Sequence, residues 1–216
     1  RRQGIVRTHG LDDATVSRLA GQFPDLLTAA QRSAEALPGL IAEFGDLIDA
    51  DEQAQIDATQ SGFINFYPDD AISPYVAIAA CGPWIITSKG RVLHDSGGYG
   101  MLGFGHTPES VITAMAKPQV MANIMSPNFS QLRVSKALRA EIGHTRGACP
   151  YSRFLTLNSG SESVSLAGRI ADTNTKLHTD PGGRHAGKRV KRIAMKGAFH
   201  GRTELPCLYS DSSKKA

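Results

Sequence analysis

The N-terminal part of the chain has the apolar spacing of amphipathic helices. Between residues 12 and 50, apolar side chains recur three and four positions apart, which is the period of one helix face. The pair Pro38-Gly39 interrupts this pattern, so we expect one helix before it and another after it. The first helix is expected to place five residues on one face: Leu26, Leu27, Ala30, Ala34 and Leu37. The second is expected to repeat the pattern with Leu40, Ile41, Phe44, Leu47 and Ile48.

After this helical region the pattern changes to short strands. Residues 84–87 and 91–94 are mostly apolar or β-branched, and they flank residues 88–90, Ser-Lys-Gly, which are typical of a tight hairpin turn. Further along, Thr107 offers a capping hydroxyl and Pro108 suits the first position of a helix. The sequence therefore predicts a β-hairpin followed by a helix.

The C-terminal half alternates between helix and strand patterns. A helix is expected over residues 131–142, a strand over 153–158, a helix over 162–175 and a strand over 190–195. A strand, a helix and a second strand in that order indicate a right-handed parallel crossover. This order of elements is typical of an α/β fold with a mostly parallel sheet.

The predicted fold class is thus α/β, and we expect three regions along the chain. Residues 1–80 form a helical N-terminal extension. Residues 81–130 contain the hairpin and a glycine-rich segment that leads into a large domain. Residues 131–216 are expected to be the first part of that large domain, whose sheet is incomplete within this sequence.

The composition of the chain argues against some classes of binding partner. The 216-residue chain carries a net charge of +4 and 41% hydrophobic residues, values that are ordinary for a globular protein. Much of the basic excess lies in residues 184–192, where no aromatic residue is interleaved to stack on bases, so we expect no nucleic-acid partner. The longest apolar run, residues 75–81, is far shorter than the ~20 residues of a spanning helix, so we expect no membrane partner. Three cysteines without metal-type spacing favour reduced thiols in a cytoplasmic protein and no metal site.

The first candidate site is the Ser159-Gly160-Ser161 segment, where the expected strand gives way to the expected helix. A glycine lets the backbone approach an anion, and the N–H groups at a helix N-terminus attract negative charge. The hydroxyl of Ser161 can add a further hydrogen bond. These features indicate a phosphate site; the alternative is that Ser161 merely caps its own helix.

The second candidate site lies about forty positions later, where Phe199, His200 and Arg202 follow an expected strand. An aromatic ring can stack on a flat ligand. The planar guanidinium of Arg202 matches the two oxygens of a carboxylate. The alternatives are a core position for Phe199, local backbone capping by His200 and a surface salt bridge for Arg202.

The segments Asn158–Glu162 and Gly197–Thr203 together resemble the class III aminotransferases, which are pyridoxal 5'-phosphate enzymes of fold type I. The resemblance extends back to about Gly82. It implies that five residues contact the cofactor: Ser159, Gly160, Ser161, Phe199 and His200. It also implies that Arg202 binds the carboxylate of the substrate and that Tyr99 is an aromatic residue of the substrate site.

The resemblance further implies the activity of the intact protein. Such an enzyme, usually a homodimer, transfers an amino group from an amine or amino acid to a 2-oxo acid. The family's Schiff-base lysine and the carboxylate beside the pyridine nitrogen are expected beyond residue 216, so we expect the chain to be inactive by itself. Lys196 is expected to be an ordinary charge at a strand end. The alternative hypotheses are an aminomutase or a decarboxylase on the same scaffold, and a non-catalytic binding or scaffolding subunit.

Overall fold

The computed structural model describes residues 3–64, 73–97, 103–120 and 125–211 of the chain. The chain divides into two compact units, Arg1–Val120 and Met121–Ala216. Each unit is described by itself.

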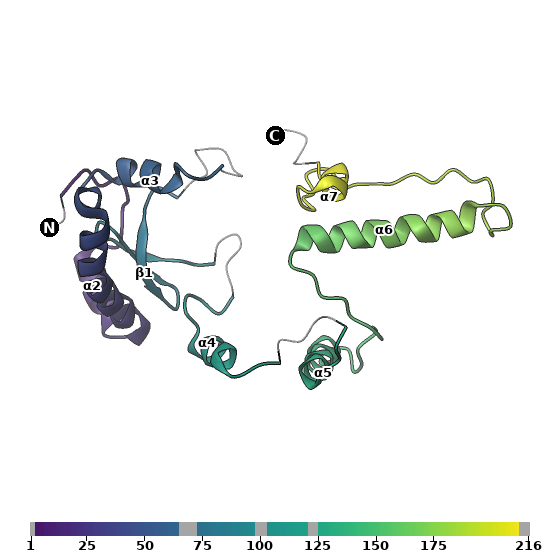
Figure 1. Ribbon diagram of the computed structural model, residues 1–216, viewed down its shortest axis with the longest axis horizontal. Helices are drawn as coiled ribbons and strands as arrows, with labels where there is room; N and C mark the ends of the chain where they lie inside the picture. The colour runs from purple at the N-terminus through teal and green to yellow at the C-terminus, as the bar shows by residue number, and fades with distance from the viewer. Residues whose placement is uncertain (1–2, 65–72, 98–102, 121–124, 212–216) are drawn as a thin grey trace. The chain divides into compact units, whose positions relative to one another are not determined.

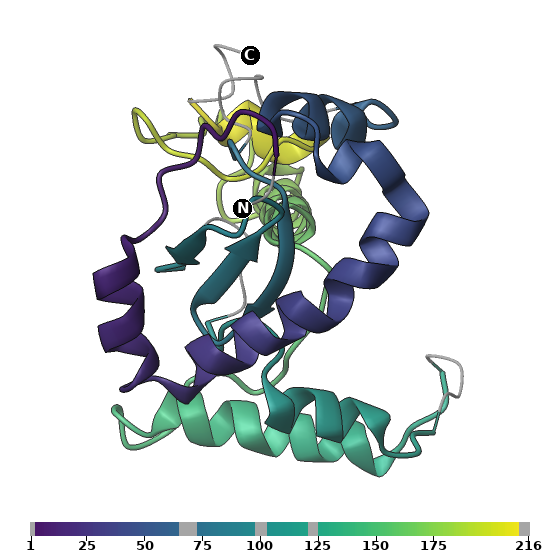
Figure 2. The ribbon, with the colours of Figure 1, turned by 90° about the vertical axis from the view of Figure 1, so that its left-hand side faces the viewer.

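The first unit contains a three-stranded antiparallel sheet with helices around it (Figure 1). Its strands lie in the order β1-β2-β3 and pair only with their neighbours in sequence. The long helix α2 crosses one face of this sheet (Figure 2). The elements of this unit are α1 (Asp13–Ala20), α2 (Pro24–Phe44), the 3-10 helix η1 (Gly45–Ile48), α3 (Glu52–Gln60), β1 (Ala77–Cys81), β2 (Trp84–Thr87), β3 (Val92–His94) and α4 (Glu109–Ala116).

The structure confirms the predicted hairpin. Strands β2 and β3 are antiparallel, with Trp84 opposite His94 and Ile86 opposite Val92. The turn between them includes Gly90 at φ +74°, a conformation that favours glycine. Strand β1 was not predicted, because the apolar run of residues 75–81 has no alternation of polar and apolar positions.

The expected break at Pro38-Gly39 is wrong, because α2 continues through Pro38 to Phe44. A proline inside a helix removes one backbone hydrogen bond and costs about 3 kcal/mol. Side chains that pack on both sides of Pro38 offset this cost. Leu26 is buried against the sheet before it, and Leu40 lines an apolar cavity together with Leu47 of η1.

The buried face of α2 also differs from the expected one. Leu26, Ala29 and Ser33 are buried. Of the expected face, Leu26 is thus buried as predicted, whereas Leu27, Ala30 and Ala34 are exposed. The sheet beneath α2 is small, so only a narrow stripe of the helix is covered. The small side chain of Ala29, which is 0% exposed, lets the helix approach the strands closely.

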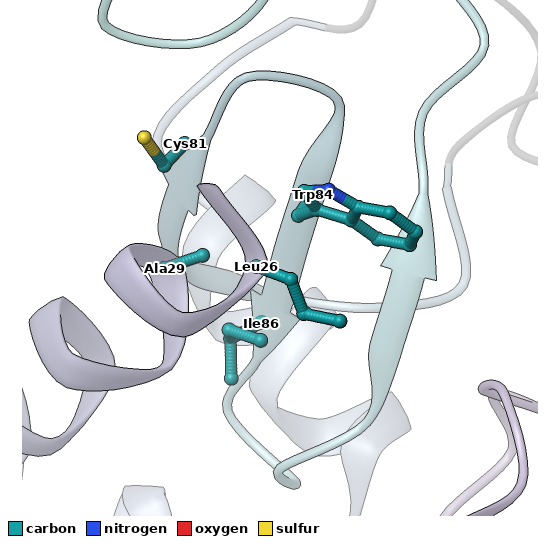
Figure 3. Close-up of a cluster of buried hydrophobic side chains, with 5 residues drawn as sticks. All are labelled: Leu26, Ala29, Cys81, Trp84 and Ile86. Carbon is teal, nitrogen blue, oxygen red and sulfur yellow. The ribbon is translucent and has the colours of Figure 1, made fainter. Parts of the chain in front are cut away.

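A cluster of buried apolar side chains joins α2 to the sheet (Figure 3). Its members are Leu26, Ala29, Cys81, Trp84 and Ile86. The aromatic ring of Phe23 lies against Trp84, with ring centroids 5.8 Å apart. Cys81, like the other two cysteines, is not paired in a disulfide.

Helix α4 begins one residue later than the sequence pattern suggests. Pro108 occupies the N-cap position, so the expected capping role of Thr107 is wrong. Thr107 has φ +49°, and its hydroxyl faces the carbonyl oxygen of Ala80 at 3.4 Å and the guanidinium of Arg32. These tertiary contacts with β1 and α2 take the place of the local cap.

Buried polar side chains attach the N-terminal segment to the rest of the first unit. Glu52 is 0% exposed, and its Oε2 accepts hydrogen bonds from the backbone N–H groups of Arg7 (2.7 Å) and Thr8 (2.8 Å). The ammonium group of Lys89 donates to the carbonyl oxygen of Gln3 at 2.7 Å. Burial without such partners would cost several kcal/mol for each charge.

Replacing Glu52 by alanine is expected to lower the free energy of unfolding of this unit by about 1–3 kcal/mol, because two backbone donors lose their acceptor. Urea unfolding followed by the fluorescence of the single tryptophan, Trp84, measures the change. Glu52→Gln keeps an acceptor oxygen and should lose less. Equal loss in both variants would show that the hydrogen bonds to Arg7 and Thr8 do not stabilise the unit.

The described residues of the second unit form helices α5 (Phe129–Gly143), α6 (Gly160–Thr179) and α7 (Glu204–Tyr209). Asn128 and Gln131 form a reciprocal capping box at the start of α5. Helix α6 confirms the helix expected over 162–175 and is longer at both ends. Helix α7 packs beside α6 (Figure 1).

The parallel crossover expected in this unit is absent from the residues that the structure describes. Residues 153–158 and 190–195 are not part of any strand. A strand needs a neighbour for its backbone groups and a layer to cover its apolar side chains. Here the side chain of Leu155 is 64% exposed and that of Ile193 is 96% exposed. Both segments have β-prone sequences, but no neighbouring strand pairs with them among the described residues.

Helices, together with a small antiparallel sheet, are compatible with part of an α/β domain. No helix among the described residues combines the length and apolarity needed to span a membrane.

Candidate functional site

The N-terminus of α6 is built by Ser159 and Glu162. The hydroxyl oxygen of Ser159 accepts a hydrogen bond from the backbone N–H of Glu162 at 3.2 Å. The carboxylate of Glu162 accepts one from the backbone N–H of Asn158 at 2.8 Å. Ser159 is therefore the N-cap, and the alternative that Ser161 caps this helix is wrong.

Gly160 and Ser161 begin the first turn of α6. Together with Ser159 we call them the phosphate turn, after the role that the sequence leads us to expect. The first backbone N–H groups of a helix have no acceptor within the helix, so they favour an anion at this end. The space beside the Cα of Gly160 is open, since a Cβ added there would meet nothing within 4 Å. Among the described residues, no atom from another part of the chain thus crowds the side of the backbone where this Cβ would point.

The second motif lies directly against the phosphate turn. Gly201 has φ +113°, and a Cβ added to it would lie 2.1 Å from Oγ of Ser161 and 2.8 Å from Cβ of Ser161. Only a glycine allows such a close approach. Two segments about forty residues apart in the sequence therefore meet at the start of α6.

We call residues 197–201 the ring loop, because they contain Phe199, the residue expected to stack on a flat ligand. The side chain of Phe199 is exposed. Phe199 is 44% exposed, so it is not a core residue and part of its ring is accessible. His200 is exposed and Arg202 is half-buried. Tyr99 lies outside the described residues.

Ser210 and Asp211 fix the backbone of the ring loop. Oγ of Ser210 accepts a hydrogen bond from the backbone N–H of His200 at 2.8 Å. The carboxylate of Asp211 accepts one from the backbone N–H of Gly197 at 2.8 Å, and its own N–H donates to the carbonyl of Ala198 at 3.0 Å. Sequence analysis missed both residues, because no local pattern marks them.

Further contacts hold the segments around α6 together. Arg192 pairs with Asp172 of α6, and its guanidinium lies 5.3 Å from the centroid of the Tyr209 ring. The hydrogen bond to Asp172 raises the pKa of Arg192. One charge of the basic segment of residues 184–192 thus has a structural role.

An open depression runs along α6 beside this site. It has a volume of about 600 Å³, and its lining includes Glu162 of the first turn and Thr203 next to Arg202. Arg169 and Asp172 contribute one charge of each sign further along the helix. The described residues contain no group of three or more histidine, cysteine or acidic side chains that could hold a metal ion.

Comparison with known proteins agrees with these motifs. A family model described as Aminotransferase class-III matches residues 68–216, which include both the phosphate turn and the ring loop. No match is found among curated proteins or among solved structures.

Proposed function

The chain belongs to the class III aminotransferase family, and from this premise we propose that it forms the cofactor-binding part of an enzyme that transfers an amino group from an amine or amino acid to a 2-oxo acid. Members of this family generally depend on pyridoxal 5'-phosphate. The observation that carries the proposal is the contact between Gly201 and Ser161, because it brings the two motifs into one site.

The residues of this site fit a phosphorylated, flat cofactor. A Cβ on Gly201 would fill the space against Ser161, so the ring loop lies as close to the phosphate turn as the backbone allows. The phosphate would accept hydrogen bonds from the N–H groups of Gly160 and Ser161 and from a serine hydroxyl. The positive end of the helix dipole adds favourable electrostatic energy at the same place.

The ring of the cofactor would lie beside Phe199, whose exposed aromatic face can stack on it for about 1 kcal/mol. His200 would lie at the edge of the same site. Arg202 would bind a carboxylate of the substrate through two parallel hydrogen bonds. When bound, pyridoxal 5'-phosphate supplies an electron sink for bonds at the substrate Cα. The protein residues bind and orient both molecules.

The same residues could serve an aminomutase or a decarboxylase, and we propose amino transfer because it is the activity that names the family. We further propose a homodimer in the cytoplasm, as the resemblance implies. An absorbance scan of the full-length protein with bound cofactor tests the reaction. A band near 420 nm that moves to about 330 nm when an amino donor is added is expected for amino transfer. An unchanged band would contradict it.

Replacing Arg202 by alanine in the full-length protein is expected to lower kcat/KM for carboxylate-bearing amino donors about 10- to 100-fold, because a charge-assisted hydrogen-bonding pair is lost. Steady-state kinetics with a donor that lacks the carboxylate provide the control, and that donor should be affected little. An equal loss for both donors would remove Arg202 from carboxylate binding.

A further inference from the structure

The residues Ser210 and Asp211 follow α7, and both form hydrogen bonds to the backbone of the ring loop. Ser210 is 0% exposed. Its Oγ accepts from the N–H of His200 and lies 3.1 Å from the carbonyl oxygen of Gly201. Asp211 holds the other end of the loop through the N–H of Gly197 and the carbonyl of Ala198.

The position of this pair is set by the same helix that carries the phosphate turn. Tyr209, the last residue of α7, packs on α6 at Gly168, where an added Cβ would lie 3.1 Å from the Tyr209 hydroxyl. The ring loop is therefore attached to α6 in two ways. Gly201 contacts Ser161 at the first turn of α6, and Ser210 and Asp211 connect the loop to the middle of α6 through α7.

We propose that Ser210 and Asp211 are positioning residues: they hold the ring loop, and with it Phe199, in a fixed position relative to the phosphate turn. This inference rests on the function proposed above. The side chains of Ser210 and Asp211 bond to the backbone at Gly197 and His200, which flank Phe199 on both sides. Loss of either bond lets the loop move relative to α6 while the phosphate turn, capped by Ser159, stays intact.

If Ser210 has this role, its loss should affect the binding of two kinds of ligand differently. A ligand that contains only the phosphate group contacts only the phosphate turn, so it should not depend on Ser210. A ligand that also contains the pyridine ring needs Phe199 in place, so it should. Purely structural residues would affect both ligands equally or neither.

The experiment compares two probes by isothermal titration calorimetry on the full-length protein. The probes are inorganic phosphate and 4'-deoxypyridoxine 5'-phosphate, which lacks the aldehyde and cannot react with surface lysines. Ser210→Ala is expected to weaken binding of the ring-containing probe about tenfold and to leave phosphate binding within about twofold. Amide hydrogen exchange at His200 should become faster in the same variant, because its acceptor is gone.

Two further variants protect the test against misfolding. Asp211 is only partly buried, so Asp211→Ala should fold, and it should show the same selective loss for the ring-containing probe. Asp211→Asn keeps an acceptor oxygen for Gly197 and should retain the affinity. The matched control is Thr179→Ala, which removes a half-buried hydroxyl that donates to Thr175 at the far end of α6 and should change nothing.

The outcomes distinguish the inference from the proposed function. If the wild-type protein binds the ring-containing probe and the Ser210 and Asp211 variants bind it equally well, the positioning role is overturned. The same holds if the variants lose both probes to the same extent. If the wild-type protein binds neither probe, the proposed function itself is overturned, and the inference with it.

Discussion

Replacing Leu26 by alanine is expected to lower the free energy of unfolding of the first unit by about 2–5 kcal/mol. Leu26 is 2% exposed and lies between α2 and the sheet, against Trp84 and Ile86 (Figure 3). The loss has two sources: the apolar side chain no longer gains from burial, and a cavity remains because the backbone of α2 and of the strands cannot close it. In a protein of ordinary stability this is a large fraction of the total.

The adjacent residue Leu27 provides the matched control. It lies on the same helix with the same side chain but is 49% exposed, so Leu27→Ala should cost less than about 1 kcal/mol. Urea unfolding monitored by Trp84 fluorescence reports on this core specifically, because Trp84 is the only tryptophan and belongs to the same cluster. Similar losses for Leu26→Ala and Leu27→Ala would mean that α2 does not pack on the sheet through this face.

Replacing Gly201 by alanine is expected to weaken binding of 4'-deoxypyridoxine 5'-phosphate by a factor on the order of 100. Two effects combine. The backbone at φ +113° is strained for any residue with a Cβ, and the new methyl group would overlap Oγ and Cβ of Ser161. The ring loop must then move away from the phosphate turn, so one ligand cannot contact both.

Gly197→Ala separates the two effects. Gly197 also has positive φ, at +74°, but a Cβ added there meets nothing within 4 Å. This variant therefore has the backbone strain without the overlap, and we expect it to lose far less affinity than Gly201→Ala. The same titration measures both. Equal losses would show that backbone strain alone matters and that the contact with Ser161 does not build the site.

Helices α5 and α6 and the hairpin could be predicted because their causes are local. The start of α6 is marked by a serine cap and an acidic residue in its first turn, and the turn at Gly90 is marked by a glycine between two apolar segments. The face of α2 could not be predicted in the same way. Leu26 and Leu27 are equally apolar, and only the position of the sheet decides which one is buried.

The strands expected at residues 153–158 and 190–195 also show that local sequence is not sufficient to predict structure. Their composition favours β structure, but a strand depends on a neighbouring strand and on a covering layer. The described residues supply neither, so the two segments stay outside any sheet. Helix α6 between them forms because its hydrogen bonds lie within its own residues.

The sequence by itself determined the family, and it marked Ser159–Ser161, Phe199 and Arg202 as candidate site residues, because these are short motifs whose chemistry is contained in the residues themselves. Only the tertiary structure decided that Gly201 rests on Ser161 and that Ser210 and Asp211 fix the ring loop. Such contacts join positions that are distant in sequence and depend on the packing of α7 on α6. No local pattern of residues encodes that packing.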